Sequence, residues 1–489
     1  MNAAEMLLQQ ARSVPDRDAL IDLTGRSVRT LTFAQLEREA AVAAAAYERS
    51  GLAPGSRVIV VHPINALLYV ALAGMFRAGI VPVVCDPGAG RLQFGRACAS
   101  VSPDAIFAST AGHLFAATIP ALRRIHRRFA FGGFPGCIDV SRGDVDPSVV
   151  RRGGDDPALI TFTSGSTGAP KALVRTHSLL RAQLNAIRAV IPLEGVDIAT
   201  MPIALLANLA AGVTSVIPSV DLGRPGEADP DRLARDVELT RATGFVASPA
   251  MLDALLRTEP SRLRSLRRIV TGGGPVMPSL MTALQSLLPD AEIVCVYGST
   301  EAEPIAFLEW SSVTNADLQA MRDGAGLLAG TPSPDSDVRM HHGEIIVAGD
   351  HVVPGYLDPT DDAKTKFRLD GRTWHRTGDG GYFDASGRVW LTGRVNAAIN
   401  DERGPMGPLR VECALSFDDG IRRSAFLGAR SRRTLFVEPR AGATPDAAWM
   451  RRAISWAHVD EVRVVSRLPV DRRHNAKIDY PALRRMLVR

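Results

Sequence analysis

Short runs of β-forming apolar residues alternate with longer amphipathic segments over most of the 489-residue chain. Residues 57–62 (RVIVVH) and 80–86 (IVPVVCD) are typical of buried strands, and residues 64–79 (INALLYVALAGMFRAG) are typical of a helix that ends at Gly79. The same alternation returns between residues 177 and 289. Strands separated by helices form βαβ units, so we predict an α/β fold whose largely parallel sheets are covered by helices on both faces.

The pattern changes near Gly343. Residues 343–358 and 372–394 consist of short strands and turn residues, which predicts a small β-rich subdomain over about residues 340–394. A polar segment rich in Gly and Pro follows. Because a chain of this length is too long for one hydrophobic core, we expect an N-terminal domain over residues 1–394 and a small C-terminal domain over residues 395–489.

The composition excludes several classes of protein. Hydrophobic residues make up 46% and charged residues 22%, which is ordinary for globular proteins. The net charge of +5 comes without a dense basic run, so we expect no nucleic-acid partner. The apolar region 58–85 is interrupted by polar residues, which predicts no membrane span. The N-terminus lacks the pattern of a signal peptide, and five scattered cysteines indicate buried thiols, so we expect a cytoplasmic protein.

Residues 163–171 (TSGSTGAPK) interrupt a β-forming run with hydroxyls, two glycines and a lysine. Consecutive backbone N–H groups, with glycines that allow close approach, form an anion-binding loop suited to a polyphosphate. The pattern Gly-x4-Gly-Lys-Ser/Thr is absent, because Pro170 precedes the lysine and Ala172 follows it. A flexible surface loop is the alternative interpretation of the same residues.

Three further segments carry residues that suit a nucleotide site. Residues 269–276 (IVTGGGPV) end a strand in glycines, against which a flat ring can lie, although a tight turn needs the same residues. In residues 296–304 (VYGSTEAEP) a strand ends at Tyr297, which can stack on a base, and a turn presents Glu301, which can hold Mg²⁺. In residues 376–394, Asp379 can accept both hydroxyls of a ribose and Arg394 can hold phosphate, although a plain β-hairpin explains them too.

Five motifs follow one another along the chain: TSGSTGAPK, YGSTE (297–301), TGD (377–379), GR (393–394) and NAKID (475–479). This order resembles the serial motifs of the adenylate-forming superfamily, which comprises acyl-CoA synthetases, peptide-synthetase adenylation domains and luciferases. The resemblance covers essentially the whole chain, including residues 31–37 (LTFAQLE) and 76–88 (FRAGIVPVVCDPG). It implies an enzyme that activates a carboxylic acid with ATP and Mg²⁺ and releases pyrophosphate. It also implies that the α+β C-terminal domain is a mobile lid.

The resemblance assigns roles to individual residues. In the family the C-terminal lysine, here Lys477, bridges the reacting carboxylate and the α-phosphate, and Arg394 lies at the ribose-phosphate beside the hinge. Only four of the 57 basic residues are lysines. Two of them lie where the motifs require lysine, and the other two, Lys364 and Lys366, fit a solvated surface segment. The remaining assignments are Thr163, Ser164, Gly165, Ser166, Thr167, Gly168 and Lys171 for the β,γ-phosphates, Gly273, Gly274 and Tyr297 for the adenine, Asp379 for the ribose, Thr300 for the α-phosphate, and Glu301 for Mg²⁺.

Within the superfamily, residues 470–478 (VDRRHNAKI), 408–417 (PLRVECALSF), 85–91 (CDPGAGR) and 213–233 resemble the β-lactone synthetases of bacterial olefin biosynthesis. This resemblance implies that a 3-hydroxy acid is adenylated and that its own hydroxyl then attacks. The family usually carries Asp or Lys just after Gly-Arg, where this chain has Asn396, and residues 400–410 (NDERGPMGPLR) replace a Gly-rich stretch that guides the CoA arm. Both departures weaken the case for a large lid rotation and a CoA half-reaction.

Two alternatives to lactone formation remain. One is a ligase that passes the acyl group to CoA or to a carrier-protein thiol, and the other is a non-catalytic nucleotide-binding relative. The intact Lys477 and Glu301 argue against the second. We expect residues 202–212 and 302–306 to line the acyl pocket, where small apolar residues favour an aliphatic acid, although core packing explains the same residues.

Overall fold

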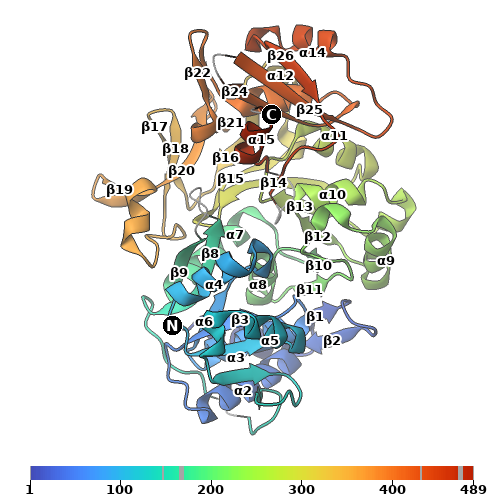
Figure 1. Ribbon diagram of the computed structural model, residues 1–489. Coiled ribbons are helices and arrows are strands. Elements are labelled where there is room, and N and C mark those ends of the chain that lie inside the picture. Colours follow the sequence, from blue (N-terminus) through green and yellow to red (C-terminus); the bar gives the residue numbers. More distant parts are fainter. Residues whose placement is uncertain (1, 146–147, 165–169, 430–431, 472–476, 488–489) are drawn as a thin grey trace.

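The computed structural model describes residues 2–145, 148–164, 170–429, 432–471 and 477–487. Two large sheets with their helices are formed by the chain up to Arg394, and smaller sheets with further helices by the chain after it. Figure 1 shows the C-terminal elements at one end of the molecule and the first helices at the opposite end. Among the described residues, no helix combines the length and the apolar character needed to cross a membrane.

The largest sheet has the order β17-β18-β20-β21-β16-β15-β14-β13-β12-β10-β11-β1-β2, with β19 beside β20. Its strands are β1 (Asp18–Asp22), β2 (Arg29–Thr32), β10 (Val196–Ala199), β11 (Thr214–Ile217), β12 (Gly244–Ala247), β13 (Arg268–Gly272), β14 (Glu292–Ser299), β15 (Ala302–Glu309), β16 (Leu327–Pro332), β17 (Asp337–His341), β18 (Glu344–Ala348), β19 (Lys366–Leu369), β20 (Arg372–Phe383) and β21 (Val389–Arg394). The strands from β1 to β14 in this order pair in parallel. β15 returns antiparallel to β14 and continues the sheet into the β-rich region.

The second sheet has the order β7-β6-β5-β3-β4-β8-β9. Its strands are β3 (Arg57–Val61), β4 (Val81–Val84), β5 (Ala105–Ala108), β6 (Arg127–Ala130), β7 (Ile138–Asp139), β8 (Pro157–Ser164) and β9 (Pro170–Thr176). All neighbours pair in parallel except β9, which returns antiparallel to β8. The segment that we predict to bind phosphate, residues 163–171, joins these two strands.

Helices pack on both faces of the parallel parts of both sheets, because the buried strands there carry apolar residues on either side. In β3, Val58 and Val60 join a core that also contains residues of the largest sheet, whereas Ile59 and Val61 join the core on the opposite face. The helices are α1 (Ala4–Ser13), α2 (Phe33–Arg49), α3 (Ala66–Arg77), α4 (Arg91–Ser100), α5 (Thr110–Ala117), α6 (Pro120–Arg123), α7 (His177–Val190), α8 (Pro202–Ala211), α9 (Pro230–Thr240), α10 (Pro249–Leu255), α11 (Pro278–Leu287) and α12 (Asn315–Arg322). The predicted layered α/β arrangement is therefore confirmed.

The chain after Arg394 forms an α+β unit. It comprises β22 (Ile399–Asp401), β23 (Gly404–Met406), α13 (Pro408–Leu415), β24 (Ile421–Ala429), β25 (Arg432–Pro439), α14 (Ala447–Ala453), β26 (Glu461–Val464) and α15 (Tyr480–Leu487). β24 and β25 pair antiparallel, and β26 joins β25 in parallel. In Figure 1, β22, β24, β25, β26 and α14 lie at the end of the molecule away from α2 and α3. The predicted small C-terminal α+β unit is present.

Candidate active site

The phosphate-loop motif connects the two strands of a β-hairpin. β8 and β9 pair with Thr163 opposite Lys171, so these two residues are direct neighbours on adjacent strands. Lys171 is buried, with only 9% of its surface exposed. The remaining predicted phosphate ligands, Gly165, Ser166, Thr167 and Gly168, lie outside the described residues, and only the backbone of Ser164 is described.

Tyr356 joins Lys171 to Glu301. The Lys171 ammonium lies 3.5 Å from the carboxylate of Asp361 and 4.9 Å from the centre of the Tyr356 ring. The Tyr356 hydroxyl donates to Oε1 of Glu301 at 2.7 Å, and the N–H of Val353 donates to the Glu301 carbonyl at 2.8 Å. Lys171 and Glu301, which belong to motifs far apart in the sequence, therefore lie on either side of Tyr356.

The surroundings of Glu301 keep its carboxylate charged. Burial opposes the charge, but His375, the Tyr356 hydroxyl and Lys366 together hold the pKa of the Glu301 carboxyl below its usual range. Lys366 donates to the carbonyl of Val353, and burial lowers the pKa of Lys366 to about 8. The prediction that Lys366 lies in a solvated segment is therefore wrong. β19 pairs with β20, and with Lys366 opposite His375 the ammonium comes within the electrostatic reach of Glu301.

Arg175 holds the backbone at Thr300. This buried guanidinium on β9 donates to the Thr300 carbonyl at 2.8 Å and to the side-chain oxygen of Gln183 on α7 at 2.8 Å. It also donates to the hydroxyl of Thr161 on β8. Sequence reasoning missed Arg175, and the available signal was a second cation, four residues after Lys171, in a short β-forming run.

Gly273 and Gly274 directly follow β13, and Tyr297 lies within the neighbouring strand β14. β13 and β14 run in parallel, and a Cβ on Gly272 would lie 2.7 Å from a backbone oxygen of β14. Gly273 has a φ of +81°, which an L side chain rarely adopts. The backbone therefore requires glycine at positions 272 and 273. β14 continues to Ser299 through an irregularity in the pairing, beyond the end predicted at Tyr297.

Asp379 connects Tyr297 on β14 with Arg394, the last residue of β21. The Tyr297 hydroxyl donates to Oδ2 of Asp379 at 2.9 Å, and Arg394 donates to Oδ1 at 2.9 Å. Arg394 also donates to the Thr377 carbonyl at 2.9 Å. Burial, and next the charge of Asp379, raises the pKa of Tyr297, so its hydroxyl stays a donor. The proposed adenine and ribose residues therefore share one hydrogen-bonded group.

Lys477 is exposed and belongs to the C-terminal unit. Its N–H donates to the Asp471 carboxylate at 2.8 Å, and its carbonyl accepts from the Asp471 N–H at 2.8 Å. These contacts attach Lys477 to its own loop. The other candidates with described side chains lie on or beside β14, β20 and Tyr356, in the chain up to Arg394.

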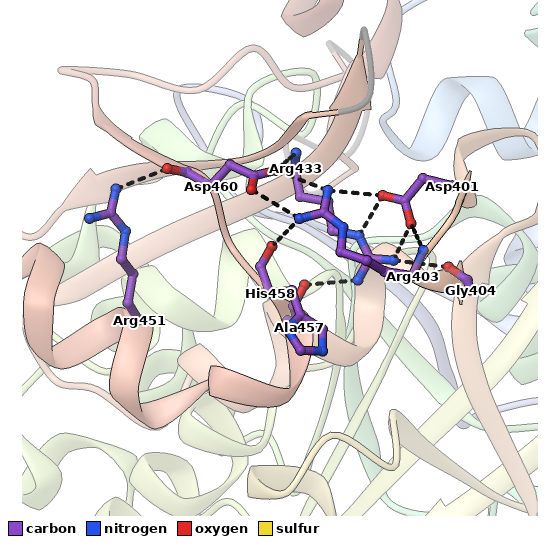
Figure 2. A network of polar contacts seen from close by, with 8 residues as sticks. All are labelled: Asp401, Arg403, Gly404, Arg433, Arg451, Ala457, His458 and Asp460. Carbon is purple, nitrogen blue, oxygen red and sulfur yellow. Dashed lines mark hydrogen bonds and ion pairs between the residues drawn. The ribbon is translucent and has the colours of Figure 1, made fainter.

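The segment that departs from the family pattern, residues 400–410, contains the β22–β23 hairpin. Arg433 is fully buried and donates to both carboxylate oxygens of Asp401, at 2.7 and 2.8 Å, and to the carbonyl of Gly404 at 2.9 Å. Arg403 in the turn reaches the Asp460 carboxylate at 2.9 and 3.0 Å. Figure 2 shows that this network fixes the hairpin to β25 and to the segment before β26.

Comparison with known proteins connects this geometry to a family. The model of the family described as "AMP-binding enzyme" matches residues 7–357. The olefin β-lactone synthetase of Stenotrophomonas maltophilia is 31% identical over 98% of this chain and 96% of that protein. The enzyme of the same name from Xanthomonas campestris pv. campestris is 30% identical over the same shares.

Among solved structures, the amide bond synthetase McbA from Marinactinospora thermotolerans superposes with a TM-score of 0.85, at 24% identity and over 99% of both chains. This similarity supports the fold. The predicted resemblance to adenylate-forming enzymes, and within them to the β-lactone synthetases, is confirmed by the family match and the two synthetases.

Proposed function

Because the chain belongs to the family of AMP-binding enzymes, we propose that it condenses a 3-hydroxy acid with ATP to an acyl-adenylate and then closes the acid to a β-lactone. The first step releases pyrophosphate and the second releases AMP. The observation that carries the first step is the meeting of Lys171, Glu301 and Tyr356 beside the strands that present Tyr297 and Asp379. The second step is supported by the likeness to two olefin β-lactone synthetases over nearly the whole chain.

The charge distribution suits the first step. A carboxylate and the α-phosphate of ATP repel each other, so cations and N–H groups must offset their charges within the site. We assign Lys171 and the hairpin turn to the β,γ-phosphates and Thr300, whose backbone Arg175 fixes, to the α-phosphate. Asp379 binds the ribose, and the glycines after β13 frame the adenine beside Tyr297.

Glu301 fits a Mg²⁺ ligand, because its carboxylate is held in the charged form. No group of three or more His, Cys, Asp or Glu side chains is arranged to hold a metal ion in the part of the chain that the structure describes. The phosphate oxygens of ATP would therefore complete the coordination. When bound, Mg²⁺ neutralises phosphate charge as the pyrophosphate leaves.

We assign Lys477 to the transition state of adenylation. An ammonium on a flexible stem can contact the reacting carboxylate and the α-phosphate together. This role requires residues 395–489 to close over the N-terminal residues 1–394 as a lid. We propose these bounds for the two domains, with the hinge directly after Arg394.

In the second step the oxygen of the 3-hydroxyl attacks the activated carbonyl carbon. The bond from that carbon to the AMP oxygen breaks, and the hydroxyl proton is released. The product is the acid less one water, while ATP has become AMP and pyrophosphate. No thiol acceptor is needed, which agrees with a hinge hairpin that ion pairs fix to the C-terminal sheet.

Mass spectrometry tests this function directly. Purified protein with ATP, Mg²⁺ and a panel of 3-hydroxy acids is expected to yield AMP, pyrophosphate and the acid less one water, without CoA. A thioester that forms only when CoA or a carrier protein is added would contradict lactone formation and identify a ligase. Absence of acid-dependent ATP–pyrophosphate exchange over the whole panel would contradict the adenylation step itself.

A further inference from the structure

The loop that carries Lys477 is closed at its base by paired backbone groups. The N–H of Asp479 donates to the Pro469 carbonyl at 2.9 Å, and Val470 and Ile478 form an antiparallel bridge. Lys477 and Asp471 make the next pair. These pairs fix the backbone at Lys477, so the position of the paired segments determines where the lysine side chain starts.

A buried carboxylate holds the first end of this loop. Glu438 on β25 is 1% exposed, and its Oε2 accepts from the N–H of Leu468 at 2.8 Å. Its other oxygen accepts from Arg422 on β24 at 3.0 Å. Burying a carboxylate is unfavourable unless it is paired and hydrogen-bonded, so this arrangement ties Leu468 firmly to the sheet.

A second buried carboxylate holds the other end. Glu412 on α13 is 5% exposed, and its Oε1 accepts from the Tyr480 hydroxyl and, at 3.1 Å, from the N–H of Phe426 on β24. Tyr480 begins α15, directly after the loop. α13 also packs against β21, whose last residue is Arg394 at the hinge. Glu412 thus connects Tyr480, at the end of the loop, to α13, which packs against β21.

The strand that supplies the first anchor is fixed at its opposite end. β25 begins beside Arg433, which the network in Figure 2 binds to Asp401 of the hinge hairpin. Glu438 lies near the other end of the same strand. Both anchors are therefore built on elements that are connected to the hinge rather than on loops.

We propose that Glu412, through Tyr480, and Glu438 are positioning residues that hold the Lys477 loop in place for adenylate formation. This proposal rests on the proposed function, because it gives Lys477 the catalytic role. The anchors act on the orientation of Lys477 and on no substrate, so they are expected to change the rate of adenylation and leave ATP affinity unaltered.

The experiment compares variants of the full-length protein by acid-dependent ATP–pyrophosphate exchange. Tyr480→Phe removes one hydroxyl, and Tyr382→Phe is its matched control, since Tyr382 donates to the Ala325 carbonyl at 3.2 Å away from the loop. We expect Tyr480→Phe to lower kcat about fivefold to tenfold, the scale of one lost hydrogen bond, with an unchanged KM for ATP. The control is expected to keep both constants.

A double variant separates positioning from a general loss of stability. Lys477→Ala alone is expected to lower exchange about 10²-fold, and adding Tyr480→Phe to it should cause no further loss. A further loss of the same fivefold to tenfold in that background would overturn the proposal, as would normal kinetics for Tyr480→Phe. Full exchange by Lys477→Ala alone would overturn the catalytic role of Lys477, on which the proposal depends.

Glu438 offers a conservative pair of variants. Glu438→Gln retains an oxygen that can accept from the Leu468 N–H, whereas Glu438→Ala does not. We expect the glutamine variant to keep kcat within about threefold and the alanine variant to lose about tenfold or more. Equal losses in both variants would show that the acceptor oxygen is irrelevant and contradict its positioning role.

Discussion

Asp379 and Arg394 face each other across β20 and β21 and form an ion pair of 2.9 Å at the last residue of β21. The other oxygen of Asp379 accepts from Tyr297 on β14. The carboxylate assigned to the ribose is therefore oriented from two sides before any nucleotide binds. A carboxylate has about four lone-pair sites, so the ribose hydroxyls can share it with these donors.

Asp379→Asn is expected to reduce kcat/KM for ATP by about tenfold to a hundredfold, the scale of lost charge-assisted hydrogen bonds. We expect this loss in kcat/KM to come from weaker binding of the ribose hydroxyls. With 2′-deoxy-ATP as the substrate, the same substitution is therefore expected to have a smaller effect. Steady-state kinetics with both nucleotides measure this difference. Equal losses with the two nucleotides would contradict the contact between Asp379 and the 2′-hydroxyl.

Lys171→Ala is expected to raise the KM for ATP about tenfold or more, because a buried cation beside the phosphate loop is lost. Lys364→Ala is the matched control, since Lys364 is exposed on the segment after Asp361. The control should bind ATP as the parent protein does. Unchanged ATP kinetics for Lys171→Ala would mean that the hairpin turn is only a surface turn.

The strands and turns of the site could be predicted from the sequence, because local patterns determine them. Strand β8, which leads into the hydroxyl- and glycine-rich segment, and the glycines after β13 are such cases. Contacts between residues far apart in the sequence could not be predicted. Lys366 follows a run of acids and another lysine, which locally indicates a solvated segment, yet pairing of β19 with β20 brings it beside Glu301. Tertiary pairing, which a local pattern does not contain, decides its environment.

Lys366→Met is expected to lower the Mg²⁺ concentration for half-maximal activity by about threefold or more. Removing a positive charge from the neighbourhood of Glu301 removes repulsion of the metal ion, an effect on the order of 1 kcal/mol in a partly screened site. Magnesium titrations at saturating ATP measure it, with Lys364→Met as the control. A higher Mg²⁺ requirement in the Lys366 variant alone would contradict this account of the charge.

Glu412→Gln is expected to change how stability depends on pH. Burial raises the pKa of Glu412 from 4.5 to about 7, so the folded protein holds a proton that the unfolded chain releases. The contribution of this group to stability is therefore full below pH 4.5 and is lost as the pH rises to about 7. The loss is at most about 3 kcal/mol.

Glutamine cannot ionise, so the variant should gain stability relative to the parent protein between pH 4.5 and 7. Urea unfolding at several pH values measures the free energy of unfolding. Because Glu412 lies in the C-terminal unit, a probe such as the fluorescence of Trp449 or Trp456 should follow the transition. Parallel pH profiles for parent and variant would contradict the raised pKa.

A matched pair of acids, one with a 3-hydroxyl and one without it, separates the two proposed steps. Both acids carry the carboxylate that reacts with ATP, so both are expected to support ATP–pyrophosphate exchange. Only the hydroxy acid holds a nucleophile beside its own activated carbonyl. Tethering removes the entropic penalty of a bimolecular step, although strain in the four-membered ring consumes part of that advantage. We therefore expect multiple-turnover release of AMP with the hydroxy acid alone, and about one equivalent of retained acyl-adenylate per protein with the other. Equal rates of AMP release from the two acids would show that the hydroxyl takes no part in the second step.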